Sequence, residues 1–288
     1  MSAHLPLHGK TALVTGVSRR RGIGFAVATK LADLGASVVI HHHRPHDLEL
    51  PWGGDDLDAV RTGVREHLVD GARFADVGAD LSDPASVPEV IGAATALTGA
   101  LDVLVCNHAK SGDDGSILDM TPERLSAFWE VNTRSTLLLT AEFARLRAPE
   151  PEEPRRPGDR IVGNGPYAEA QGHVFWMTSG QISGAMRGEV AYAASKAALA
   201  GVTATVAAEL LELGIILNTI NPGPVNTGYM DPATTDRSLE DLHAYIASTP
   251  FGRVGTPADP AELIGWLATA SGSWMVGQVL TTDGGFGL

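Results

Sequence analysis

A strand, a glycine-rich turn, a helix and a second strand open the chain, and this succession constrains its fold most strongly. Residues 10–15 (KTALVT) are an apolar, β-rich run that ends at a glycine. Residues 23–34 have a helix-like pattern, and residues 36–40 (ASVVI) are a second apolar run. In such a βαβ unit the N-terminus of the helix receives a pyrophosphate. The sequence therefore predicts an α/β sheet that binds a dinucleotide.

Further apolar runs alternate with helical segments along the rest of the chain. Strands are expected at residues 73–80, 101–106, 173–178, 215–220 and 278–282. Helices are expected at residues 121–147 and 259–270 and around Tyr192. The alternation predicts one Rossmann-type, doubly wound sheet of about seven parallel strands flanked by helices. We expect residues 1–288 to form a single dinucleotide-binding catalytic domain.

Two stretches depart from this alternation. Residues 148–158 (APEPEEPRRPG) contain four prolines, which exclude a regular helix. We interpret residues 148–172 as a proline-rich insertion. Residues 226–257 lack strong periodicity apart from a short helix near 238–247. A long connection at the end of a strand predicts a substrate lid.

Composition and charge exclude several classes of protein. The net charge of −13 argues against binding to nucleic acids or membrane surfaces. We expect no membrane span, because no apolar run approaches about 20 residues, and the first ten residues lack the apolar core of a signal peptide. The single cysteine, Cys106, fits a reducing compartment and a cytoplasmic location. Near His41 and His43 no cysteine or paired acid completes a metal site, so none is expected.

The cofactor is inferred from charge around the glycine turn. A site for NAD usually places a carboxylate on the ribose hydroxyls about 20 residues past the glycines. Here that position is Arg44, and no acid follows before Asp47. The turn itself adds Arg19, Arg20 and Arg21. Because guanidinium groups match phosphate oxygens, the cluster suits a 2′-phosphate and favours NADP(H) over NAD(H).

A tyrosine and a lysine four residues apart are the strongest catalytic candidates. Tyr192 and Lys196 lie in a helix-favouring run, so both side chains project from one face. A cation beside a phenol lowers the pKa of the phenol, and such a tyrosine can act as a general acid. The pair alone is also common on helix surfaces. Its weight comes from Ser179, at the end of an expected strand, and from Asn132, at an unfavourable mid-helix position.

Taken in order, these motifs resemble the short-chain dehydrogenase/reductase family, especially its 3-oxoacyl-[acyl-carrier-protein] reductase-type branch. The interval of 13 residues from Ser179 to Tyr192 also matches. The glycine turn is two residues longer than in that family, and His108-Ala109 replaces Ala-Gly. The matching motifs are Thr15-Gly16 with Gly22-Ile23-Gly24, Asp80, Cys106-Asn107-His108-Ala109, Val131-Asn132, Ser179, Tyr192 with Lys196, Asn221-Pro222-Gly223 with Thr227, and Asp283-Gly284-Gly285.

The resemblance implies a role for each candidate. Tyr192 would donate a proton to a substrate carbonyl as NADPH delivers hydride, and Lys196 would lower the tyrosine pKa and bind the nicotinamide ribose. Ser179 would position the carbonyl oxygen, and Asn132 would hold a water that links Lys196 to solvent. The cofactor contacts implied are Gly16, Ser18, Arg19, Arg21, Gly22, Ile23, Gly24, His43, Arg44, Asp80, Leu81, Asn107, His108, Ala109, Tyr192, Lys196, Pro222, Gly223, Val225 and Thr227.

The expected function is NADPH-dependent reduction of a ketone, with 3-oxoacyl thioesters among the candidate substrates. Two alternatives stay open: an NAD-dependent alcohol dehydrogenase of the same family, and a dinucleotide-binding regulatory protein without turnover. Enoyl reductases of the superfamily also have a longer glycine turn, but they space the tyrosine and lysine further apart. The partner expected is a small carbonyl or alcohol substrate. By resemblance, residues 272–288 imply a homotetramer or homodimer.

Overall fold

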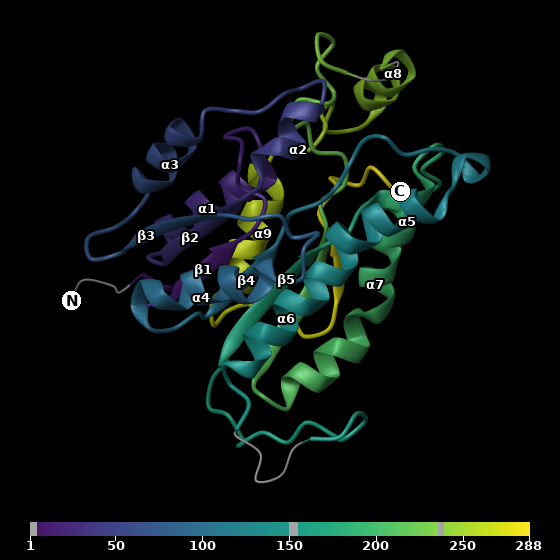
Figure 1. The fold of residues 1–288 in the computed structure, drawn as a ribbon. Helices are drawn as coiled ribbons and strands as arrows, with labels where there is room; N and C mark the ends of the chain where they lie inside the picture. The colour runs from purple at the N-terminus through teal and green to yellow at the C-terminus, as the bar shows by residue number, and fades with distance from the viewer. Residues whose placement is uncertain (1–4, 150–154, 236–238) are drawn as a thin grey trace.

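A seven-stranded, all-parallel sheet forms the centre of the computed structural model, which describes residues 5–149, 155–235 and 239–288 (Figure 1). The strand order is β3-β2-β1-β4-β5-β6-β7, which confirms the Rossmann-type fold that the sequence predicted. The strands are β1 (Thr11–Val14), β2 (Ser37–His42), β3 (Phe74–Gly78), β4 (Val103–Cys106), β5 (Gly172–Met177), β6 (Ile215–Asn221) and β7 (Val279–Thr281).

Helices cover both faces of the sheet, and each layer has its own apolar core. On one face α1 packs against α9, and on the other α4, α6 and α7 lie side by side (Figure 1). The helices are α1 (Ile23–Asp33), α2 (Arg44–Glu49), α3 (Leu57–Arg65), α4 (Ser86–Thr98), α5 (Pro122–Phe128), α6 (Ser135–Arg145), α7 (Val190–Leu211), α8 (Glu240–Ser248) and α9 (Ala258–Leu267).

The central strands are buried on both faces, as their unbroken apolar sequences require. Every residue of β1, β2, β4, β5 and β6 is buried. The strand order reverses between β1 and β4, because the chain runs outward from β1 through β2 to β3 and then returns to β4. Ligands of such sheets bind at this reversal, beyond the carboxyl ends of the strands.

The helix predicted over residues 121–147 is not continuous. A π-helical turn, Trp129–Arg134, separates α5 from α6. The buried amide of Asn132 lies within this turn and bonds to the backbone of Lys110. One-turn π segments inside α-helices are frequent at functional sites.

The described part of the proline-rich segment, residues 155–171, lies at the amino-terminal edge of the sheet (Figure 1). Gln171 N–H donates to the Gly214 carbonyl, just before β6, at 2.8 Å. The Tyr167 hydroxyl donates to the Glu212 carbonyl at 3.1 Å. These contacts hold the segment far from the carboxyl ends of the strands, where α2 and α8 lie.

Among the described residues, α7 is the one helix whose length and composition would suit a membrane span. It packs against β6 and carries the buried, charged side chain of Lys196. These contacts make α7 a helix of the folded core.

Candidate active site

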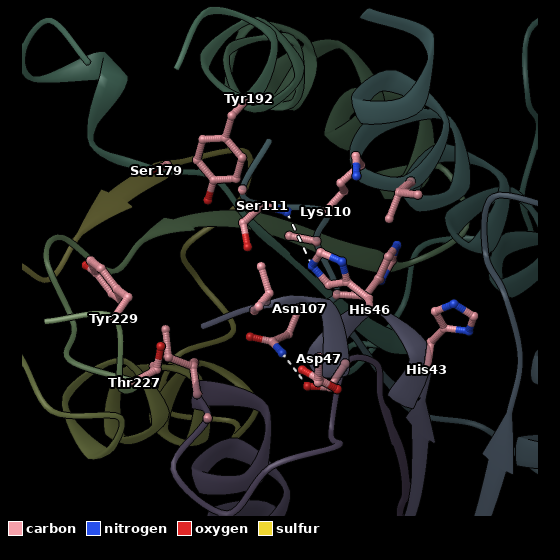
Figure 2. Close-up of a pocket in the computed structure, with 18 of the residues that line it drawn as sticks. His43, His46, Asp47, Asn107, Lys110, Ser111, Ser179, Tyr192, Thr227 and Tyr229 are labelled. Atoms are coloured by element: carbon pink, nitrogen blue, oxygen red, sulfur yellow. Dashed lines mark hydrogen bonds between the residues drawn. The ribbon is translucent and has the colours of Figure 1, made fainter. Parts of the chain in front are cut away.

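A cavity of about 930 Å³ lies over the carboxyl ends of the strands (Figure 2). Its volume is at the upper end of the range of about 300–1,000 Å³ for small-molecule sites. Ser179 lines it. Most of the cofactor contacts implied by the sequence also line it: Gly16, Ser18, Arg19, Gly22, Ile23, His43, Asp80, Leu81, Asn107, His108, Ala109, Tyr192, Pro222, Gly223, Val225 and Thr227.

The glycine turn forms a close-packed cradle at one end of the cavity. Gly16 has a φ of +70°, and a Cβ there would lie 2.7 Å from the Cα of His108. A Cβ on Gly24 would lie 2.6 Å from Nδ2 of Asn107. That nitrogen donates to the carbonyls of Thr15 and Gly16, at 3.0 and 3.1 Å. The turn is thus held against the end of β4 in a shape that fits a dinucleotide pyrophosphate at the start of α1.

Tyr192 and Ser179 meet at the other end of the cavity. Tyr192 stands in the first turn of α7, and Ser179 follows β5. The phenol points into the cavity beside Ser179 (Figure 2). The Ser179 side chain is close enough to act on the pKa of the phenol. Lys196 is buried one turn further along α7, where its Nζ lies 5.8 Å from the ring centre of Tyr192. The phenol is therefore directed into the cavity, with the lysine behind it.

The electrostatics of this pair differ from the sequence prediction. Burial raises the pKa of Tyr192 to about 12, although the Ser179 hydrogen bond acts in the opposite direction. Burial also lowers the pKa of Lys196 to about 8, against the opposing influence of Cys106. The predicted lowering of the tyrosine pKa by Lys196 is not seen, because desolvation dominates. The Lys196 ammonium donates to the Met177 carbonyl at 2.9 Å.

Comparison with known proteins identifies the family. A family model for the short chain dehydrogenase matches residues 10–238, which include the glycine turn, Ser179 and the Tyr192–Lys196 pair. The chain belongs to the short-chain dehydrogenase/reductase family. The resemblance drawn from the motifs is confirmed, and the family assignment makes the protein an oxidoreductase.

Relatives match this short-chain dehydrogenase over almost its whole length. An NADPH-dependent aldehyde reductase-like protein of Arabidopsis thaliana is 33% identical, with 98% of this chain and 96% of the relative covered. A 3-oxoacyl-[acyl-carrier-protein] reductase of Vibrio cholerae is 30% identical, with 97% of this chain and 98% of the relative covered. The structure of a short chain dehydrogenase from Burkholderia cenocepacia was solved in complex with NADP. It is 30% identical, its TM-score is 0.76, and the match covers 98% of this chain and 100% of that chain.

Two of the arginines that suggested a phosphate-binding cluster do not line the cavity of this family member. Arg44 is exposed at the start of α2. The Arg21 guanidinium pairs with Asp231 at 2.7 Å. Their predicted cofactor contacts are therefore not supported by the structure. Arg19 does line the cavity, and its guanidinium donates to the Thr227 carbonyl.

Arg20 is also held by a carboxylate. Its guanidinium makes two hydrogen bonds to Asp55, at 2.8 and 2.9 Å. Such a bidentate pair fixes the guanidinium plane. The cationic character of the glycine turn at the cavity therefore rests on Arg19.

Asn132 acts on the backbone of the loop after β4. Its Oδ1 accepts from Lys110 N–H at 2.6 Å, and its Nδ2 donates to the Lys110 carbonyl at 3.1 Å. Nδ2 also donates to the hydroxyl of Ser195, the residue before Lys196, at 2.9 Å. Asn132 and Lys196 are not among the cavity-lining residues, and Gly24 contributes by packing.

His108 stands where the family's motif has an alanine, and its side chain is buried. Its ring lies between Thr15 and Ser135, with Nδ1 2.6 Å from one hydroxyl and Nε2 2.7 Å from the other. Burial lowers the pKa of His108 well below its usual value. The neutral imidazole thus ties the end of β1 to the start of α6.

The site residues named from the sequence omit two groups of cavity residues, although the long connection over residues 46–58 also suggested a flap over the adenosine end of the cofactor. One is the loop Lys110–Asp114 after β4, and the other is α2 with the residues that follow it. The signal for the second group was the unusually long connection between β2 and α3, since most βα connections have 2–6 residues. From this second group the cavity is lined by Pro45, His46, Asp47, Glu49, Leu50 and Trp52.

Proposed function

We propose that this protein is an NADPH-dependent reductase that converts a ketone to a secondary alcohol. The observation that carries the proposal is the placement of Tyr192 and Ser179 side by side at the cavity wall, with Lys196 one turn behind. The glycine cradle fits a dinucleotide, and NADPH bound there would supply the hydride.

The residues at the cavity wall supply the proton. Because burial raises the pKa of Tyr192 to about 12, its phenol carries a proton at neutral pH and is ready to donate it to a carbonyl oxygen. Ser179 would donate to the same oxygen and stabilise the developing alkoxide.

The choice of NADPH rests on Arg19 and on the relatives. Arg19 is a cation on the cavity wall, beside the glycine turn. The Arabidopsis relative is described as NADPH-dependent, and the Burkholderia structure contains NADP. We therefore propose NADPH as the cofactor of this protein as well.

The substrate class proposed is a ketone flanked by apolar groups, with 3-oxoacyl thioesters to be tested first. The name of the Vibrio relative suggests this class. Met186, Tyr229 and Met230 line the cavity and offer apolar contacts. We further propose that residues 226–257 serve as the substrate lid, since Thr227, Tyr229, Met230 and Leu239 all line the cavity.

A screen of purified protein against a ketone panel with NADPH tests the proposal. We expect at least one ketone to support NADPH oxidation, which is measured as a loss of the absorbance of the reduced nicotinamide. Tight NADPH binding without turnover on any ketone or alcohol would support the non-catalytic regulatory protein instead.

A second candidate is an NAD-dependent alcohol dehydrogenase, and one observation favours it. The Asp47 carboxylate lines the cavity, whereas the sequence argument placed no acid at the ribose. Turnover of secondary alcohols with NAD, exceeding ketone reduction with NADPH, would favour this candidate.

We also propose a cytoplasmic homotetramer or homodimer that acts on small molecules and binds no nucleic acid or membrane. The support is the net charge of −13 and the exposed apolar side chains of the last segment, of which Trp274 is 97% exposed. Light scattering of the purified protein tests the oligomeric state. The proline-rich segment 148–172 is proposed as an insertion without a catalytic role.

A further inference from the structure

A half-buried lysine stands on the cavity wall without a carboxylate partner among the described residues. Lys110 follows β4 and lines the cavity (Figure 2). Within residues 5–149, 155–235 and 239–288, no aspartate or glutamate forms an ion pair with its ammonium. Charged groups that are withdrawn from water are usually paired. The ammonium is therefore available to an anionic group on a molecule bound in the cavity.

The acids closest to Lys110 in the loop and in the π-helical turn are engaged by other groups. Glu130 pairs with an arginine of its own turn at 3.3 Å. Asp113 pairs with an arginine of α5 at 3.6 Å. Asp114 accepts from two backbone N–H groups at the start of α7. These interactions leave the positive charge of Lys110 uncompensated by its acidic neighbours.

Contacts with Asn132 and Phe128 fix the place of this charge. The Asn132 amide bonds to both the backbone N–H and the carbonyl of Lys110, at 2.6 and 3.1 Å. The Lys110 Nζ lies 5.5 Å from the ring centre of Phe128, which is buried in α5. Such a cation–π contact leaves the N–H donors of the ammonium available.

The same aromatic ring connects Lys110 with the proposed proton donor. The Phe128 ring stands edge-on to the Tyr192 ring, with 6.4 Å between ring centres. The ammonium and the phenol therefore both lie next to Phe128, and both belong to the wall of one cavity (Figure 2). A molecule of modest length that presents a carbonyl to Tyr192 can also reach Lys110.

The charges at this end of the cavity favour a group with a single negative charge. Burial raises the pKa of Tyr192 to about 12, and the negative charge of Glu189 adds to the effect. One ammonium with a carboxylate nearby suits a carboxylate ligand better than a phosphate dianion. The pyrophosphate of a dinucleotide has its own place in the glycine cradle, at the other end of the cavity.

We propose that Lys110 binds a carboxylate of the substrate, so that the protein reduces an oxo acid rather than a neutral ketone. The inference rests on the proposed ketone reduction and narrows its substrate class. The ketone oxygen would lie at Tyr192 and Ser179. The carboxylate, separated from the ketone by a short chain, would accept a charge-assisted hydrogen bond from Lys110 and takes no part in the reduction itself.

The test compares oxo acids with their methyl esters, beginning with levulinate and methyl levulinate and continuing with longer members of the series. Each ester keeps the ketone and lacks the charge. We expect the wild-type kcat/KM for the best acid to exceed that for its ester by about tenfold or more. In Lys110→Met the KM for the acid rises, and the acid-to-ester ratio falls to within about twofold of unity. Lys110→Arg keeps the charge and retains a preference for the acid.

Lys10→Met is the matched control. It removes the same charge from the start of β1, at the opposite edge of the sheet, where Lys10 pairs with Asp102 at 3.3 Å, and it keeps the wild-type ratio. Lys110→Gln provides a second variant should Lys110→Met fold poorly.

Three results would overturn the inference and leave ketone reduction intact. The first is wild-type reduction of neutral ketones without a preference for any oxo acid over its ester. The second is a wild-type ratio in folded Lys110→Met. The third is a weaker NADPH Kd in that variant with an unchanged ratio, which would assign the lysine to the cofactor. If the wild-type protein reduces no ketone, charged or neutral, the proposed function itself fails.

Discussion

The Asp114 carboxylate accepts a hydrogen bond from the backbone N–H of Tyr192 at 2.7 Å. Its other oxygen accepts from Ala191 N–H at 3.1 Å. The helix's own N-cap residue, Glu189, makes no side-chain capping hydrogen bond. Asp114, from the loop after β4, therefore caps the helix turn that carries Tyr192.

This cap leads to the first prediction. Asp114→Ala lowers kcat by about ten- to hundredfold, because small displacements of a catalytic group cost that much, while the cofactor Kd stays within about twofold. Asp119→Ala is the control, since Asp119 caps a 3₁₀ turn in the same connection by accepting from Ser116. A kcat for folded Asp114→Ala equal to that of the control would show that the cap has no catalytic consequence.

The pKa of Lys196 predicts a specific pH dependence of stability. Burial lowers that pKa to about 8 in the folded protein; an unfolded lysine titrates near about 10.4. Between these values the unfolded chain binds more protons, so the contribution of Lys196 to the free energy of unfolding rises with pH. Relative to Lys196→Met, the wild-type protein gains on the order of 2 kcal/mol between about pH 8 and pH 10.

Urea unfolding of both proteins across this range measures the gain. The comparison cancels groups common to both proteins, such as Cys106, whose pKa burial raises. A difference in free energy that is constant with pH would mean that the ammonium is not desolvated in the folded protein.

The glycine cradle predicts opposite effects for two glycine-to-alanine changes. A Cβ at Gly24 would lie 2.6 Å from both Asn107 Nδ2 and the Gly16 carbonyl oxygen, so Gly24→Ala weakens dinucleotide binding and destabilises the fold by about 1–3 kcal/mol. A Cβ at Gly92, in α4, would meet no atom within 4 Å, so Gly92→Ala stabilises the protein by about 0.5–1 kcal/mol. Thermal unfolding measures the stability of both variants, and NADPH titration measures their dinucleotide binding. Equal effects of the two substitutions would contradict the close packing inferred at Gly24.

The fold was predictable because its signals are local. Runs such as residues 101–106 are apolar throughout, as strands buried on both faces must be. The π-helical turn was not predictable, because the partner of Asn132 is Lys110, 22 residues away. Such a pairing leaves no periodic trace in the sequence.

The cofactor argument shows the limit of counting charges. Arg20 and Arg21 are cations in the sequence, but Asp55 and Asp231 neutralise them across 35 and 210 residues. The sequence argument placed Asp47 too far along the chain to reach the ribose, yet α2 brings it back into the cavity. Both outcomes depend on tertiary contacts that composition does not encode.

The most direct test of the central claim is the kcat of Tyr192→Phe beside a matched tyrosine variant. Removing the Tyr192 hydroxyl removes the proton donor, so kcat for ketone reduction with NADPH falls by about 10²- to 10⁴-fold while the NADPH Kd is retained. Tyr167→Phe makes the same chemical change at the opposite edge of the sheet, where the hydroxyl bonds to the Glu212 carbonyl, and leaves kcat unchanged. Wild-type turnover by folded Tyr192→Phe would contradict the account.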